Sequence, residues 1–241
     1  MTRVAGIPRL SSFKTPSRQS REYIYYRYYF KDLKDVFDTC IKENDTVFDI
    51  GCGNKPFEAY IRTLIKNYDA SAYRGCDIIQ SSGQKVDIIC DVTNIAEKSS
   101  TYDIVICTQV IEHVFEHSKV FEEAYRLLKP GGFFIVSSNL VWEIHEAPYD
   151  YYRFTKYGFI KLLENAGFNV QEAKSNGGKF AVLGQLILHV SGGENRGLKR
   201  VFYAIARRCL TLMCNMVFPL LDDKFKDDRY TLNYVFAGKK Q

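Results

Sequence analysis

The sequence lacks the features of a membrane-spanning, secreted or disulfide-bonded chain. No apolar run approaches the ~20 residues needed to cross a bilayer. The first residues, MTRVAGIPRLSSFK, lack the apolar core of a secretory signal. The seven cysteines are an odd number and no two have CxxC spacing, so neither a disulfide framework nor a zinc site is indicated. We therefore expect a cytoplasmic protein with reduced cysteines.

Tryptophan is scarce, with one residue, but 17 tyrosines and 17 phenylalanines bring the aromatic fraction to 15%. With 46% apolar and 25% charged residues over 241 positions, the composition is typical of one soluble domain. The charge is uneven, because residues 1–34 hold eight Lys or Arg and two acidic residues, whereas the remainder holds 25 and 26. A basic leading segment can contact nucleic acid, anionic lipid or an acidic substrate, or it can be a solvated tail.

From residue 46 onwards, short apolar runs alternate with amphipathic stretches. Strands are expected at 46–50, 73–79, 86–92, 102–110, 133–139, 168–175 and 230–240, and helices at 57–68, 117–132 and 155–167. This alternation predicts an α/β fold with a doubly wound parallel sheet that is covered on both faces. Only about eight residues separate the second and third strands, so we expect an irregular link there instead of a helix.

The chain divides into a core and two additions within a single domain. Residues 1–44 predict a basic arm followed by a helix at 20–43, which carries an apolar stripe at helical spacing. Residues 45–175 and 229–241 form the expected sheet core. The segment 176–228 is too long for a simple connection and predicts a helical insertion before the last strand.

The strongest motif is Asp49-Ile-Gly51-Cys52-Gly53-Asn54, directly after the first strand. Glycines at this point let the backbone turn tightly and approach a ligand closely, and ligands of doubly wound sheets bind at the carboxyl ends of the strands. A dinucleotide site would need GxGxxG, but Pro56 occupies the place of the third glycine. The acidic residue before the first glycine suits a cationic ligand better than a phosphate.

Polar residues also follow the next three strands. Asp77 ends the second strand, where a carboxylate can accept both hydroxyls of a ribose. Asp91 follows the third strand, where it can take the exocyclic amine of adenine, with Val92 against the ring. Thr108 and Gln109 follow the fourth strand and would flank a methionine moiety. Four strand ends in register, each with a fitting residue, predict one nucleoside-binding pocket.

With these motifs the chain resembles the class I methyltransferases that use S-adenosylmethionine (SAM), in particular their small-molecule branch. The resemblance rests on VFDIGCGN, RGCDI, CDV, YDIVICTQVIEHV and LLKPGGFFIV, and covers about residues 45–172 and 229–239. It implies a Rossmann-like seven-stranded sheet whose last strand is antiparallel, with SAM as the cofactor. The residues implied to bind SAM are Asp49, Gly51, Cys52, Gly53, Asn54, Asp77, Ile78, Asp91, Val92, Thr108 and Gln109.

A narrower resemblance lies after the fifth strand. The string EIHEAPYDYYRFT at 143–155, followed by a helix and AGF, is similar to bacterial methyltransferases found with surface-polysaccharide biosynthesis. It favours O-methylation of a small or saccharide-like acceptor.

Four residues are candidates for the acceptor side. The sulfonium of SAM is already electrophilic, so positioning carries much of the rate, but a hydroxyl acceptor needs help to lose its proton. His145 follows the fifth strand and His113 the fourth, and each is read either as a catalytic or substrate-contacting group or as a structural residue. Tyr152 and Arg153 either line the acceptor pocket, where Arg153 suits a carboxylate or phosphate, or belong to a packed loop.

A metal site and three other functions fit the sequence less well than SAM-dependent methylation. Glu112, His113, Glu116 and His117 lack a convincing third ligand, so no metal is predicted. RNA methylation is suggested by the basic start, but an NPPY-type tetrad is replaced by TQVI at 108–111, so a nucleic-acid partner is not expected. A non-catalytic SAM-binding module and an NAD-dependent dehydrogenase fit the motifs less well.

The predicted insertion contains two apolar portions, 181–190 and 209–221, each too short to span a bilayer. Basic residues at 199, 200, 207 and 208 lie near the start of its second helix, a distribution that suits anionic headgroups. Two expectations follow. The insertion either forms a hydrophobic cap beside the acceptor site that contacts a membrane surface peripherally, or it packs against the sheet or against a second subunit in a homodimer.

Overall fold

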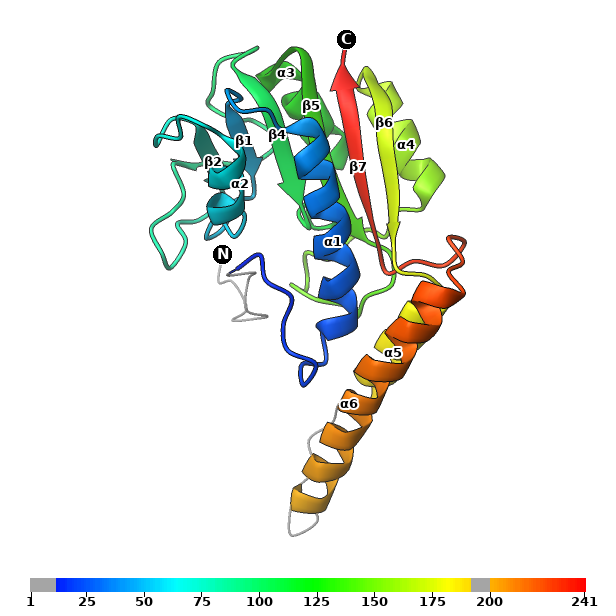
Figure 1. Ribbon diagram of the computed structural model, residues 1–241. Coiled ribbons are helices and arrows are strands. Elements are labelled where there is room, and N and C mark those ends of the chain that lie inside the picture. Colours follow the sequence, from blue (N-terminus) through cyan, green and yellow to red (C-terminus); the bar gives the residue numbers. More distant parts are fainter. Residues whose placement is uncertain (1–11, 192–199) are drawn as a thin grey trace.

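The computed structural model describes residues 12–191 and 200–241. Strands and helices alternate along much of the chain, and the strands form one central sheet (Figure 1). They are α1 Tyr23–Cys40, β1 Val47–Ile50, α2 Glu58–Leu64, β2 Tyr73–Asp77, β3 Ile88–Ile89, β4 Tyr102–Thr108, the 3-10 turn η1 Ile111–His113, α3 His117–Leu127, β5 Leu128–Asn139, α4 Lys156–Asn165, β6 Phe168–Asn176, α5 Lys179–Val190, α6 Arg200–Lys224 and β7 Asn233–Lys240.

The sheet has seven strands in the order β3-β2-β1-β4-β5-β7-β6. Strands β1 to β5 pair in parallel, whereas β7 runs antiparallel to both β5 and β6. The predicted fold class is thereby confirmed, including the antiparallel last strand. The strand order reverses between β1 and β4, which places a topological switch point at the carboxyl ends of these two strands.

Helices cover both faces of the sheet. Alternate side chains along a strand point to opposite faces and pack in separate hydrophobic cores. In β4, Ile104 and Ile106 join the core beneath α1, whereas Val105 and Cys107 join the core of the opposite face with α3 and α4. The connection between β2 and β3 holds turns and no helix, as its short length predicted. All seven cysteines are free.

Helix α1 lies along one face of the sheet, and its apolar stripe is buried as predicted (Figure 1). It contacts β6, β7, α5 and α6, so it joins the sheet to the segment that precedes the last strand. Five members of the predicted stripe are buried and the sixth, Tyr26, packs half-buried against the same core. The buried five are Tyr29, Phe30, Leu33, Val36 and Phe37.

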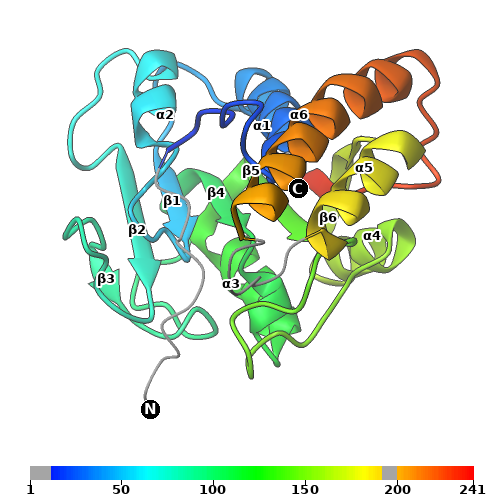
Figure 2. The ribbon, with the colours of Figure 1, turned by 90° about the horizontal axis from the view of Figure 1, so that it is seen from below.

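Helices α5 and α6 lie side by side and project from the body of the molecule (Figures 1 and 2). They approach closely at Gly184, where a Cβ atom would come within 2.7 Å of Phe218. The expectation that no segment is long enough to cross a bilayer is wrong for α6. The part Tyr203–Lys224 of α6 has 22 residues and is long and apolar enough to cross a membrane, by length and composition alone. In the most apolar stretch of this part, 22% is buried within the protein.

Candidate active site

A cavity of about 1060 Å³ opens at the carboxyl ends of β1, β2 and β4, beneath the first turns of α1. Most of the predicted site residues line it together, although they come from five different segments. These are Asp49, Gly51, Cys52, Gly53, Asp77, Ile78, Asp91, Val92, Thr108, Gln109, His113 and His145. The switch point of the sheet is therefore also the place where the sequence motifs meet.

The loop after β1 needs glycine at Gly51 for two separate reasons. Its φ is +73°, which L side chains rarely adopt, and a Cβ atom would lie 2.4 Å from Cγ2 of Val110. The loop is held to β2, because the Gly51 N–H donates to the Cys76 carbonyl at 2.8 Å and the Gly53 N–H donates to Asp77 Oδ2 at 3.1 Å. The backbone of this loop therefore forms a fixed wall of the cavity.

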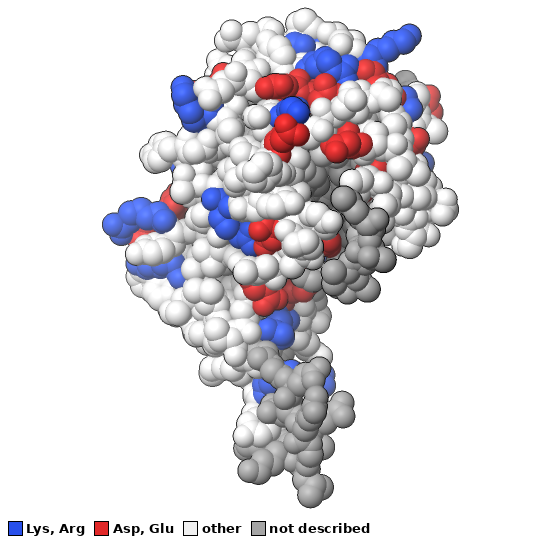
Figure 3. Space-filling model, turned by 180° about the vertical axis from the view of Figure 1, so that it is seen from behind, with Lys and Arg blue, Asp and Glu red and all other residues white. Residues whose placement is uncertain are grey.

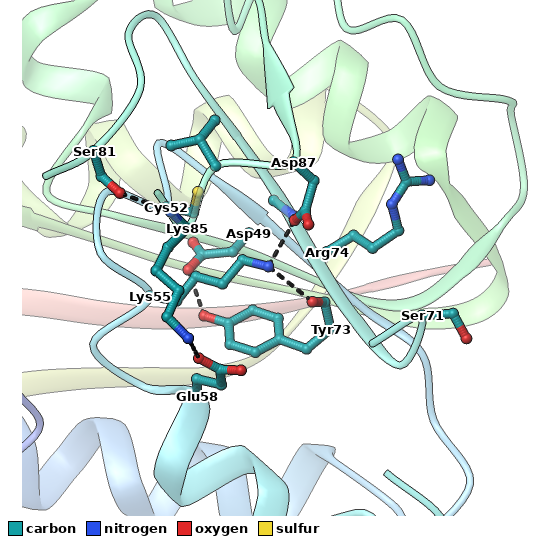
Figure 4. A network of polar contacts seen from close by, with 12 residues as sticks. Asp49, Cys52, Lys55, Glu58, Ser71, Tyr73, Arg74, Ser81, Lys85 and Asp87 are labelled. Atoms are coloured by element: carbon teal, nitrogen blue, oxygen red, sulfur yellow. Dashed lines mark hydrogen bonds and ion pairs between the residues drawn. The ribbon is translucent and has the colours of Figure 1, made fainter. Parts of the chain in front are cut away.

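A polar network beneath the loop was not predicted from the sequence (Figure 4). The Tyr73 hydroxyl donates to Asp49 Oδ2 at 2.5 Å, and the buried Lys55 ammonium donates to the Tyr73 carbonyl at 3.0 Å and to Asp87 at 2.6 Å. Asp87 also accepts from the Gly75 N–H at 2.7 Å. The network ties the glycine loop to β2 and to the irregular link before β3, and so fixes the orientation of the Asp49 carboxylate.

Burial dominates the electrostatics of Asp49. It raises the pKa of this carboxyl to about 7, although the Tyr73 hydrogen bond acts in the opposite direction. A cation in the cavity would favour the ionised form, so the acidic residue before the first glycine is poised for a positively charged ligand. This agrees with the preference inferred from the sequence.

The nucleoside end of the cavity combines carboxylates with exposed apolar side chains. Asp77 is buried and accepts from the Ile78 N–H at 2.7 Å, while Asp91 Oδ1 accepts from the backbone and hydroxyl of Thr93 at 2.8 and 2.7 Å. Ile78 and Ile79 are exposed large hydrophobic residues that line the cavity. Such surfaces suit the faces of an adenine ring.

Gln109 lines the cavity and forms hydrogen bonds with three other side chains. Its amide donates to Ser137 Oγ and Asn233 Oδ1, both at 3.0 Å, and its Oε1 lies 3.2 Å from the Tyr25 hydroxyl. That hydroxyl also donates to Asn139 Oδ1 at 2.6 Å. Tyr25 was missed by the sequence analysis because it lies beside the apolar stripe of α1, where a tyrosine gives no signal of its hydroxyl contacts.

His113 and His145 come together at the other end of the cavity. Their ring centroids are 4.6 Å apart. Nδ1 of His113 lies 3.0 Å from the Tyr149 carbonyl, and Nδ1 of His145 lies 3.2 Å from the Glu143 carbonyl. Burial lowers the pKa of His113 below its ordinary value, which favours a neutral ring near pH 7.

Three predicted site residues lie outside the cavity lining and have other partners. Asn54 accepts from the Gly83 N–H at 3.0 Å, so it ties the glycine loop to the link between β2 and β3. The Tyr152 hydroxyl donates to the Phe115 carbonyl at 3.1 Å. Arg153 forms a bidentate ion pair with Asp150 at 2.6 and 2.8 Å, so its guanidinium is occupied within its own loop.

Asp150 connects Arg153 to His145. Partial burial raises its pKa, but the Arg153 and His145 contacts outweigh burial and lower the pKa to about 2. The carboxylate accepts from the His145 backbone N–H at 3.0 Å and lies 3.2 Å from Nδ1 of the same residue. Arg153 thus holds the group that positions His145, which corresponds to the packed-loop alternative for Arg153 and not to the acceptor-pocket one.

Residues 21–173 match the sequence profile of the methyltransferase domain family. The chain belongs to this family. It contains a methyltransferase domain of the class I, SAM-dependent type, and its Rossmann-like fold agrees with that assignment. The cofactor predicted from the motifs, SAM, is confirmed at the level of the family.

Curated relatives share parts of the methyltransferase chain. A ubiquinone biosynthesis O-methyltransferase of Paraburkholderia xenovorans (strain LB400) is 34% identical over 101 residues, covering 39% of this chain and 44% of the relative. A phosphoethanolamine N-methyltransferase of Triticum aestivum is 25% identical over 161 residues, covering 58% of this chain and 30% of the relative. The chain thus spans less than half the length of these relatives.

Solved structures share the fold at low sequence identity. The Burkholderia thailandensis 1,6-didemethyltoxoflavin-N1-methyltransferase, solved with S-adenosylhomocysteine, has a TM-score of 0.55 at 12% identity and covers 88% of this chain and 77% of its own. A SAM-dependent methyltransferase of Archaeoglobus fulgidus has a TM-score of 0.54 at 14% identity and covers 92% of this chain and 95% of its own.

The residues of this structure fit SAM. The absence of a side chain at Gly51 lets the backbone of the glycine loop form the cavity wall, since a Cβ atom there would clash with Val110. Asp49 lies where a cationic ligand would favour its charged form. Asp77 offers a carboxylate at the end of β2. When bound, SAM supplies the activated methyl group. The chain itself supplies the orientation of the donor and the groups that receive the acceptor.

Proposed function

We propose that this methyltransferase transfers the methyl group to a hydroxyl oxygen of a small or saccharide-like acceptor. The observation that carries the proposal is the pair His113 and His145 in the cavity wall, with each Nδ1 facing a backbone carbonyl. A carbonyl can only accept, so a neutral ring carries its hydrogen on Nδ1 and leaves Nε2 as an acceptor. Such an acceptor helps a hydroxyl to lose its proton as it attacks the sulfonium methyl.

The remaining lining supports an acceptor with a ring. Aromatic side chains line the same cavity and offer faces on which a sugar or a phenol can stack. Among the relatives, the printed names include an O-methyltransferase and an N-methyltransferase, and the histidine pair favours the oxygen acceptor. The aromatic members of the lining are Tyr26, Phe30, Phe115, Trp142, Tyr149 and Tyr151.

Tritium transfer from labelled SAM into a lysate of the source cells tests this function. We expect the label in a small-molecule or saccharide fraction, in a form that resists ribonuclease and has the stability of a methyl ether. A parallel reaction without the enzyme serves as the control. Label in ribonuclease-sensitive material, or on nitrogen, would contradict the proposed O-methylation.

The second part of the proposal is that the α5–α6 hairpin rests on a membrane surface. Residues 203–209 of α6 are exposed on every side, and Leu220 is 69% exposed. Among the described side chains between 203 and 221 the only charged ones are Arg207 and Arg208. Figure 3 shows acidic and basic side chains interspersed on the body and, on the uncovered part of the projecting end, basic and uncharged ones.

This charge distribution favours lipid over a second copy of the chain. A symmetric dimer through the hairpin would bring the same arginine-bearing surface against itself, whereas anionic headgroups complement it. The apolar side chains that flank the arginines would enter the interface between headgroups and acyl chains. The most exposed of these on the two helices are Val190, Ile205, Met213, Met216 and Leu220.

Co-sedimentation with vesicles tests the membrane contact. We expect the wild type to pellet with vesicles rich in phosphatidylserine and the Arg207→Glu/Arg208→Glu variant to stay in the supernatant, because the variant repels anionic headgroups. The Lys66→Glu/Lys161→Glu variant makes the same charge change on the body and should pellet like the wild type. Equal recovery of all three in the supernatant, with a dimer in light scattering, would assign the hairpin to self-association.

A further inference from the structure

Three side chains with metal-ligating atoms converge at the histidine end of the cavity. They are Glu112 and His113 of η1 and His145 of the loop after β5, and their ligating atoms all lie within 4.8 Å of one another. The sequence predicted no metal site, because the pair His113 and His117 lacks a convincing third ligand. The folded loop after β5 supplies that ligand from 32 residues further along the chain.

Both histidines are oriented as metal-binding histidines are. Nδ1 of His113 faces the Tyr149 carbonyl, and Nδ1 of His145 lies 3.2 Å from both the Glu143 carbonyl and Asp150 Oδ2. Such partners fix the ring and its tautomer, and they leave the Nε2 lone pair free for a cation. Among residues 12–191 and 200–241, neither Nε2 is engaged in a hydrogen bond.

Glu112 is a buried carboxyl group that forms no ion pair in the described part of the chain. Burial raises its pKa, although the Ser138 hydroxyl and the Arg153 charge act in the opposite direction. Its side chain is fully buried, Oε1 accepts from Asn139 Nδ2 at 3.3 Å, and Oε2 has no hydrogen-bond partner in the described part of the chain. No described lysine or arginine forms an ion pair with it. Buried polar atoms without partners are rare, because losing hydration without a replacement is costly. A cation would supply the missing partner.

We propose that Glu112, His113 and His145 bind one divalent first-row transition-metal ion, such as Zn²⁺, at the acceptor end of the cavity. Two imidazoles and one carboxylate are the ligand set of many catalytic zinc sites, which keep a further position open. Ligands around one such ion lie about 4 Å apart at most. One ligating atom from each of the three residues lies within 4.8 Å of the others, so the side chains would rotate to close the remaining gap.

This inference rests on the proposed O-methylation and names how the hydroxyl is activated. The acceptor oxygen would occupy the open position, where the ion lowers its pKa and the hydroxyl proton passes to water. The oxygen then forms a bond to the methyl carbon as the carbon–sulfur bond breaks, and the electron pair of that bond goes to sulfur to give S-adenosylhomocysteine. His145 would act here by holding the ion instead of taking the proton itself.

Titration of the full chain with Zn²⁺ and with Co²⁺, after removal of metals by a chelator, tests the site. We expect one equivalent of either ion by calorimetry and a visible Co²⁺ absorption band. Glu112→Gln, His113→Ala and His145→Ala should each weaken binding at least about tenfold, as expected for the loss of one ligand. His189→Gln removes a histidine of α5 that bonds Gln185 and should bind like the wild type.

Binding of S-adenosylhomocysteine, measured on every variant, shows which of them are folded. If Glu112→Gln fails this check, the His145→Ala variant decides, because it alters a loop at the cavity wall. No ion bound by the wild type, or equal binding by wild type and all folded variants, would overturn the metal site. Methyl transfer that continues in the chelated enzyme would overturn the role of the ion and leave the proposed O-methylation intact.

Discussion

Replacing His145 with alanine should lower the turnover number about 100-fold or more, while the dissociation constant for SAM stays within about twofold. The expected loss is that of a group which activates the acceptor hydroxyl, whether by taking its proton or by holding a cation. The affinity for SAM should persist because the donor residues at β1, β2 and β3 are held by their own contacts, such as Asp77 with the Gly53 N–H.

Steady-state rates with the acceptor identified by tritium transfer, together with calorimetric titration of SAM, check this prediction. The His189→Gln variant provides the control, since His189 lies outside the cavity lining. A comparable loss of SAM affinity in His145→Ala would place His145 on the donor side. Unchanged turnover would remove it from the chemistry and leave it a structural residue of the loop.

The expected donor side of the cavity could be predicted because its residues lie at or near the carboxyl ends of strands. Asp49 lies near the end of β1, Asp77 ends β2 and Asp91 follows β3, and parallel strands bring their carboxyl ends to one edge. No knowledge of loop conformation was needed. The placement of these residues therefore followed from strand order alone.

The acceptor side could be predicted only in part, because it depends on the path of the loop after β5. Both histidines were identified as candidates, but the approach of His145 to Glu112 and His113 of η1 depends on turns of that loop. Arg153 could not be distinguished from a substrate-binding arginine, since its partner Asp150 lies three residues away. Likewise, the pairing of Lys55 with Asp87 arises from the short link before β3, which has no regular pattern.

Removing the Asp222 carboxylate should lower the free energy of unfolding by about 3 kcal/mol. Asp222 is fully buried in α6, and its carboxylate accepts from three backbone N–H groups at the start of α5, those of Gly178, Phe180 and Ala181, at 2.8 to 3.0 Å. It therefore caps a helix of another segment, where the amino-terminal dipole also favours a negative charge. In Asp222→Ala these donors lose their acceptor.

Thermal unfolding of the wild type, Asp222→Ala and Asp228→Ala measures this effect. For a chain of this size the expected loss corresponds to a fall in the melting temperature of roughly 10 °C. Asp228 is mostly exposed and pairs with Lys226, so its variant should melt close to the wild type. Because Asp222 fastens α6 to the first turn of α5, its loss should also loosen the packing of the two helices against each other. Wild-type stability in Asp222→Ala would mean that the packing of Gly184 against Phe218 holds the hairpin without this cap.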